Sequence, residues 1–200
     1  MPHSAPPAAE AAQTLADDER RHYDAPEMAF HWATAALVVA LFLLAEAWGF
    51  VAAKGSPARH AMQSLHVSLG LLLATVLVLR ILWRIGPGRR PLPASSGLIE
   101  MAAIAVHYLL YGLLVCQVVL GVLWRWGNHD PLSLFGWFTV PALLDLTKPQ
   151  AHFIGQLHNW VAWLIIGLAG LHAGAALGHH FVLRDDVLRR MLPLRRARRI

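Results

Sequence analysis

The chain has 200 residues, of which 56% are hydrophobic and only 14% charged, and this is too apolar for an ordinary soluble domain of that size. Its net charge of +5 comes from basic residues that flank apolar runs, and no nucleic-acid-binding motif accompanies them. The composition therefore indicates one integral membrane domain surrounded by lipid and argues against a nucleic-acid partner.

The first 24 residues differ in composition from the rest of the chain. They are rich in Ala, Pro and acidic residues and lack the apolar core of a secretory signal peptide. We expect residues 1–24 to form a mobile cytoplasmic tail, residues 25–194 to form the membrane domain, and residues 195–200 to form a basic C-terminal tail.

Four apolar runs follow, each long enough to cross a ~30 Å hydrocarbon core as a helix. The predicted fold class is all-α, an integral membrane four-helix up-down bundle, with spans at about 29–51, 61–83, 99–124 and 151–181. Glu46 is the only charged residue of the first span, and an ionised carboxylate is costly in lipid. We therefore expect Glu46 to be protonated or to face the water of a connecting loop.

Basic residues are distributed unequally between the two ends of this bundle. Thirteen of the seventeen Lys and Arg residues fall on the side of the two termini and the 84–98 connection. By the positive-inside rule, both termini are expected in the cytoplasm. On the opposite side, the segment 127–148 is too short for a span and is interrupted by Pro141, which predicts an interfacial or re-entrant segment.

The fourth span carries two histidines, His158 and His172, fourteen residues apart. Fourteen residues of helix rise about 21 Å and make close to four turns, so both imidazoles point to nearly the same side. Two histidines on one side of a membrane helix, one in each leaflet, suit two stacked haems. The spacing therefore predicts two haem sites, each with a histidine ligand from this helix.

Partners for these histidines are found at matching depths on other spans. His31 lies near the inner end of the first span and pairs with His172, whereas His66 lies near the outer end of the second span and pairs with His158. A single histidine in a span is more often a hydrogen-bonded polar group than a ligand, but four at two depths favour haem ligation. His107 in the third span competes with His31 as the inner ligand, or contacts a quinone.

The arrangement resembles the bacterial cytochrome b561 family of four-helix, di-haem, quinone-linked membrane cytochromes. Residues 24–194 share the resemblance, which rests on four stretches: "AFHWATAALVV", "SLHVSLGLLLATVLVLRILWR", "AVHYLLYGLLVCQVVLG" and "LHNWVAWLIIGLAGLHAGAALGHHFVLRDDVLRRMLP". The short standalone members, which include the superoxide oxidase type, are the most similar. The resemblance implies a multi-pass protein of the bacterial inner membrane with two haem b groups, held by His31 and His172 at the inner site and by His66 and His158 at the outer site.

The resemblance also implies transfer of electrons from periplasmic superoxide through the haems to ubiquinone. Candidates for contacting the quinone or passing protons at the inner end are His179, His180 and Arg80, although an arginine at a span end also reaches the headgroups for purely structural reasons. Candidates for steering an anion at the outer end are the four basic residues there, which are also ordinary surface charge: Lys54, Arg59, Arg125 and Lys148.

Two other functions remain open from the sequence. The chain is alternatively the cytochrome b subunit of a larger complex, taking electrons from a periplasmic dehydrogenase such as a hydrogenase or formate oxidase, with the segment 127–148 as the docking surface for the partner subunit. A haem-free transporter or metal-binding membrane protein also uses histidines within its spans.

Overall fold

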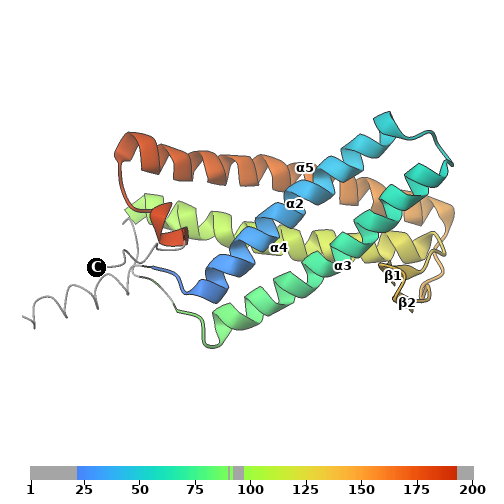
Figure 1. Ribbon diagram of the computed structural model, residues 1–200, viewed down its shortest axis with the longest axis horizontal. Coiled ribbons are helices and arrows are strands. Elements are labelled where there is room, and N and C mark those ends of the chain that lie inside the picture. Colours follow the sequence, from blue (N-terminus) through green and yellow to red (C-terminus); the bar gives the residue numbers. More distant parts are fainter. Residues whose placement is uncertain (1–21, 90, 92–96, 193–200) are drawn as a thin grey trace, which may run out of the picture.

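The structure, a computed structural model, describes residues 22–89, 91 and 97–192. The predicted tail residues 1–21 and 195–200 lie outside the described residues. Four long α-helices dominate the described part, and the last continues into a π-helix and then a short 3-10 helix (Figure 1). In chain order the helices are α2 (Ala25–Val51), α3 (Pro57–Ile85), α4 (Gly97–Gly127), α5 (Lys148–Gly178), η1 (His179–Leu183) and η2 (Arg189–Met191).

A helix covers each predicted span, with η1 continuing α5 past residue 181, and α2, α3 and α5 begin earlier than predicted, at polar caps. Asp24 caps α2, with its side chain accepting a hydrogen bond from the Glu27 N–H at 2.9 Å. Ser56 caps α3 in the same way, and Thr147 forms a capping box with Gln150 at the start of α5. Each of these three helices also has a proline in its first turn, where the missing N–H costs no helical hydrogen bond.

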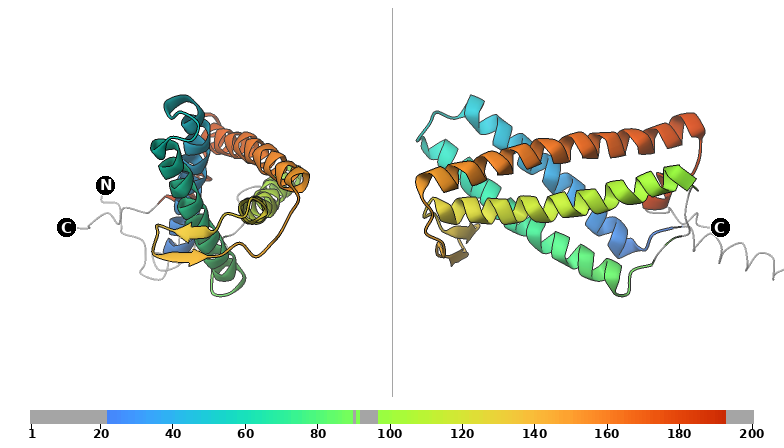
Figure 2. Two further views of the ribbon diagram at one scale, coloured as in Figure 1. Left: turned by 90° about the vertical axis from the view of Figure 1, so that its right-hand side faces the viewer. Right: turned by 180° about the vertical axis from the view of Figure 1, so that it is seen from behind.

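The helices are arranged as two antiparallel pairs. α2 packs along α3, α4 packs along α5, and the two pairs cross obliquely (Figures 1 and 2). Where they cross, Leu77, Leu114 and Ile165 form a buried apolar cluster. The first and last described residues lie at the same end of the bundle, which we call the inner end; the opposite end, with the 52–56 and 128–147 connections, is the outer end. The order is that of an up-down four-helix bundle, as predicted.

The surface of the bundle is apolar along its whole length. All four long helices are long and apolar enough to cross a membrane, and large hydrophobic side chains cover their outward faces. A water-soluble bundle of this size would bury such faces, so the structure confirms a membrane domain.

A short β-hairpin occupies the outer end, where the sequence predicts only an interfacial or re-entrant segment. β1 (Leu132–Leu134) pairs antiparallel with β2 (Phe138–Val140). Ser68 of α3 holds the hairpin: its hydroxyl donates to the Ser133 carbonyl at 3.1 Å and accepts from the Phe135 N–H at 2.9 Å. Backbone groups near the membrane must find partners within the protein, and the hairpin and Ser68 supply them.

The inner end is held together by residues just before α2. The Asp24 carboxylate accepts hydrogen bonds from the Trp83 indole at 3.1 Å and from the Arg89 backbone N–H at 2.9 Å. The Tyr23 N–H donates to the Arg190 carbonyl at 3.3 Å. Residues 22–24, which the sequence assigns to the tail, are thus attached to α3 and to the chain after η1.

We expect Asp24→Ala to lower the stability of the protein by about 1–2 kcal/mol at neutral pH, because it removes the cap of α2 and two further hydrogen bonds. Burial raises the pKa of the Asp24 carboxyl, but hydrogen bonds from Arg89, Glu27 and Trp83 outweigh it and hold the pKa below its ordinary value of 3.8. A lowered folded-state pKa stabilises the fold above the ordinary pKa, and this contribution is lost as the pH falls through the folded-state pKa.

Thermal unfolding midpoints of wild type and Asp24→Ala in detergent, compared from pH 7 down to about pH 3, measure this effect. The two midpoints should converge at the acid end. Asp186→Ala, which removes only an exposed ion pair to Arg189, is the matched control and should have little effect at any pH. A constant difference between wild type and Asp24→Ala across the range would show that the carboxylate charge is not responsible.

Candidate functional site

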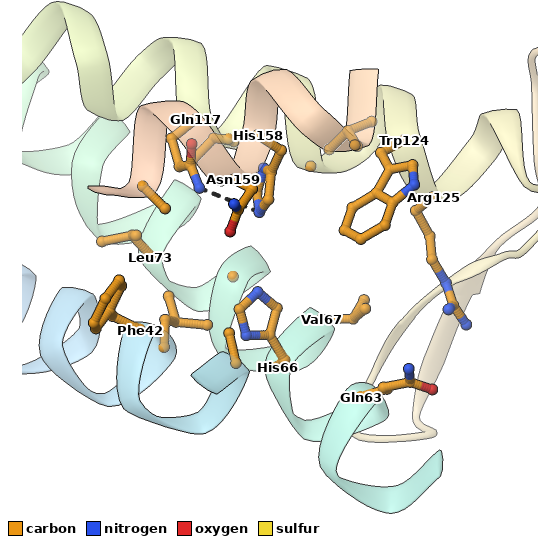
Figure 3. A pocket seen from close by; sticks show the side chains of 18 of the residues that line it. Phe42, Gln63, His66, Val67, Leu73, Gln117, Trp124, Arg125, His158 and Asn159 are labelled. Carbon is orange, nitrogen blue, oxygen red and sulfur yellow. Dashed lines mark hydrogen bonds between the residues drawn. The ribbon is translucent and has the colours of Figure 1, made fainter. Parts of the chain in front are cut away.

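The outer histidine pair faces across a cavity between the two helix pairs. His66 of α3 and His158 of α5 point toward one another, with ring centroids 6.4 Å apart and ring planes at 73° (Figure 3). The cavity has a volume of about 500 Å³, within the usual range for cofactor sites. The Trp48 ring packs edge-on against the His66 ring, with ring centroids 5.3 Å apart. The ring centroids of Trp124 and His158 are 5.8 Å apart. Both imidazoles are therefore positioned by neighbouring aromatic rings.

The spacing of this pair fits two ligands on opposite sides of one iron. Metal–imidazole bonds are about 2 Å long, so two imidazoles across one metal ion place their ring centroids about 6 Å apart. The Nδ1 atoms of both His66 and His158 are buried without a hydrogen-bond partner in the described part of the chain. Gly70, one turn from His66, lines the cavity, and a Cβ there would meet no atom within 4 Å. The donor set and the open space both fit a haem.

Polar side chains line the cavity beside the histidines. The Gln117 amide of α4 donates to Nε2 of His158 at 3.2 Å. Glu46 lines the same cavity and is half-buried. Further polar side chains of the lining come from α3, α4, α5 and the connection after α4: Gln63, Arg125, Asn128, Asp130 and Asn159.

The inner pair repeats the geometry of the outer pair. His31 of α2 and His172 of α5 have ring centroids 6.4 Å apart and ring planes at 67°. Both histidine pairs thus join α5 to the helices α2 and α3. Along α5 the two pairs are separated by fourteen residues, a rise of about 21 Å. The structure brings together each pair of histidines that the sequence matched by depth.

His107 lies beside the inner pair rather than opposite it. Its ring centroid is 4.9 Å from that of His172, closer than two imidazoles across one metal ion, and its Nδ1 is 2.6 Å from the Ala103 carbonyl of its own helix. The spacing favours His31 over His107 as the partner of His172. With Nδ1 donating to that carbonyl, His107 has Nε2 left to accept a hydrogen bond.

Arg80 is enclosed by protein at the inner end. Its side chain donates from Nη2 to Nδ1 of His31 at 3.1 Å, lies over the Tyr111 ring at 5.0 Å, and pairs with Glu27 at 3.8 Å. Arg84 also pairs with Glu27, at 3.7 Å. The sequence singles out Arg80 as a quinone or proton contact, whereas its contacts in the structure are to a histidine, a tyrosine and a carboxylate.

Sequence reasoning missed Glu27, the most deeply buried ionisable side chain at this end, which is only 2% exposed. A signal was present, because Glu27 precedes His31 by four residues and so lies on the same helix face. A partner on α3 was not visible from this spacing alone.

The two histidines at the end of α5 have different surroundings. Nδ1 of His179 is 2.5 Å from the Asp185 carboxylate, and this hydrogen bond, opposed by a smaller desolvation effect, holds the pKa of Asp185 below its ordinary value. Nδ1 of His180 is buried without a hydrogen-bond partner in the described residues. The His179 contact crosses the π-helical turn η1, a feature often found at functional sites.

The four basic residues of the outer end do not form one patch. Arg125 lines the cavity and pairs with Asp130 at 3.1 Å. Arg59 lies 3.4 Å from the Ala52 carbonyl, where it caps the end of α2. Lys54 and Lys148 are exposed. Of the four, Arg125 alone lines the cavity.

Comparisons with known proteins agree in their family description. A family model described as prokaryotic cytochrome b561 matches residues 22–194. The chain is 42% identical to cytochrome b561 homolog 2 of Escherichia coli K12, over 85% of this chain and 90% of that protein. It is 27% identical to the probable superoxide oxidase CybB of Yersinia pestis, over 88% of this chain and 99% of that protein. It is also 28% identical to cytochrome b561 homolog 1 of Escherichia coli K12, over 83% of this chain and 94% of that protein.

We expect His158→Ala to lose one of two bound haems, because only one of the two histidine pairs is broken. Haem content per chain, measured as the pyridine haemochrome, should fall by about half, as each iron needs both imidazoles. His152→Ala, an exposed histidine on the same helix and in neither pair, is the control and should keep the full content. Full haem content in His158→Ala would refute the assignment.

Gly70→Leu tests the cavity separately from the ligands. The new side chain meets no atom at its Cβ, so the helix tolerates it, but the side chain occupies space that the outer haem needs. Haem content should again fall by about half while both histidines of the pair remain. Gly49→Leu, whose Cβ also meets nothing within 4 Å and which lies outside the cavity lining, should bind haem normally. Equal haem content in the two variants would place the haem elsewhere.

Proposed function

Because the chain belongs to the prokaryotic cytochrome b561 family, whose members are haem b-binding membrane electron-transfer proteins, we propose that it oxidises superoxide at its outer end and reduces ubiquinone at its inner end. The observation that carries the proposal is the pair of equal histidine sites, each with ring centroids 6.4 Å apart, at two depths of one membrane bundle. Two such sites span the distance between a donor on one face and a quinone near the other.

The residues divide into two ligand pairs. His66 and His158 would hold the outer haem, and His31 and His172 the inner one. When bound, each haem b supplies an iron that takes up and releases one electron at a time.

Superoxide is the lead donor on two grounds. A relative named a probable superoxide oxidase matches the chain over 99% of its own length. At the outer end, Arg125 places a cation in the lining of the cavity, and Lys54 of the 52–56 connection and Lys148 at the start of α5 are exposed, where they attract an anion. Two superoxide anions release two O2 and two electrons, and these two electrons with two protons convert one ubiquinone to ubiquinol.

The inner end supplies the groups that the quinone reaction needs. His107 has Nε2 available to hydrogen-bond a quinone oxygen beside His172. The His179 and Asp185 pair lies between this site and the end of the bundle, so it is suited to deliver protons, with His180 as its neighbour. Arg80 is buried too deeply to be the first contact of a quinone, and its guanidinium contacts His31 instead.

The orientation of the bundle completes the proposal. The excess of basic residues on the side of the two termini supports an orientation in the bacterial inner membrane with the inner end in the cytoplasm. Superoxide is then oxidised on the periplasmic side, and the protons for ubiquinol come from the cytoplasm.

A second function is favoured by the β-hairpin. Trp137 and Phe138 at its tip are 89% and 64% exposed, so the outer end presents aromatic side chains to which a partner subunit would bind. In that case the chain is the cytochrome b subunit of a complex, and a periplasmic dehydrogenase such as a hydrogenase or formate oxidase supplies the electrons.

An assay of the isolated protein separates the two functions. Purified haem-loaded protein with ubiquinone and a steady source of superoxide should form ubiquinol faster than the same mixture without protein, and His158→Ala should abolish the difference. Added superoxide dismutase should also abolish it, because it removes the donor. If wild type with both haems gives no stimulation, superoxide is not the donor and the subunit function takes its place.

A further inference from the structure

Arg80 contacts a proposed haem ligand from behind. Its guanidinium lies 3.1 Å from Nδ1 of His31, and the residue is 7% exposed. Arginine carries its charge permanently and only donates hydrogen bonds, so a fixed cation lies next to the imidazole. Haem-ligating histidines normally donate this second ring N–H to an acceptor, so the arrangement at His31 is the reverse of the usual one.

The outer site has a different electrostatic environment. Nε2 of His158 accepts a hydrogen bond from the neutral Gln117 amide, and Nδ1 of His66 has no hydrogen-bond partner in the described residues. Among the charged side chains that line the outer cavity, Arg125 and Asp130 form an ion pair whose charges cancel, and Glu46 adds no positive charge in either protonation state. At the inner end, Glu27 faces both Arg80 and Arg84, with one positive charge in excess.

A nearby positive charge stabilises whichever redox state carries the extra electron. The effect is strong where water does not screen it, and Arg80 and Glu27 are both buried. Hydrogen bonds to the ligands and buried charge are among the means by which a protein changes the reduction potential of a haem. Both differences therefore act in the same direction: they raise the potential at the inner site relative to the outer one.

We infer that Arg80 is a positioning residue that acts through His31 to raise the reduction potential of the inner haem above that of the outer haem. The inference rests on the proposed function, since it needs both haems. It gives the direction of electron transfer: one electron leaves the outer site and one arrives at the inner site, next to His107 and the proposed quinone contact, with no proton required for this step.

Spectroelectrochemical titration of the haem-loaded protein tests the inference without any activity measurement. In Arg80→Gln, the equilibrium constant for distributing one electron between the two haems should move at least tenfold toward the outer haem. This corresponds to a change of about 59 mV in the difference between the two reduction potentials. Arg80→Lys keeps a cation and should retain most of the wild-type potential. Glu27→Gln removes the opposing negative charge and should raise the inner potential. Arg189→Gln, an exposed arginine paired with Asp186, is the control and should leave both potentials unchanged.

The affected haem is identified by repeating the titration in His158→Ala, where only the inner haem remains and its potential should fall on Arg80→Gln. If Arg80→Gln loses the inner haem, the other two variants test the inference: Arg80→Lys should keep most of the wild-type inner potential, and Glu27→Gln should raise it. Unmoved potentials in a protein that holds both haems would overturn the inference and leave the proposed function intact. A wild-type protein without haem would overturn the proposed function, and the inference with it.

Discussion

Each histidine pair brings α5 next to a helix of the α2 and α3 pair. The two imidazoles, with ring centroids 6.4 Å apart, are polar groups through which the two halves of the bundle meet. Between these two levels, the halves contact through the apolar cluster of Leu77, Leu114 and Ile165. α2 packs mainly on α3 and α4 mainly on α5, so the relative position of the two pairs depends on few side chains. An iron held by both imidazoles of a pair would connect the two halves directly, which couples cofactor binding to the packing of the domain.

Lipid around the bundle requires every polar group inside it to have a hydrogen-bond or ion-pair partner in the protein. A polar or charged side chain in a span must find its partner within the protein, because the hydrocarbon offers none. Arg80 and Glu27 satisfy this requirement across two helices, and Gln117 with His158 does so across another two. The Ser68 hydroxyl does the same for the backbone of the hairpin. The first two contacts therefore also join the helices within each pair, and the third joins the hairpin to α3.

The two ends of the bundle differ in ways that agree with different chemistry at each. The outer end has an open cavity whose lining is mixed in charge, and the exposed Lys54 and Lys148 lie at the same end. The inner end has a buried ion network, a histidine beside the ligand pair, and the His179 and Asp185 pair near the end of α5. A small donor that needs only access suits the first, and an acceptor that needs protons suits the second.

Much of this follows from the chain alone. Apolar runs longer than a bilayer predict four helices, and the constant rise of a helix predicts which histidines lie at the same depth. Depth does not say which helices face each other, so the sequence predicts His31 as the inner ligand but leaves His107 as an alternative; the ring distances to His172 favour His31. The same limit hid the contact of Glu27 with Arg80 and the fold of the 127–148 segment into a hairpin held by Ser68. These features depend on contacts between residues far apart in the chain, and such contacts are set by packing, which local periodicity does not encode.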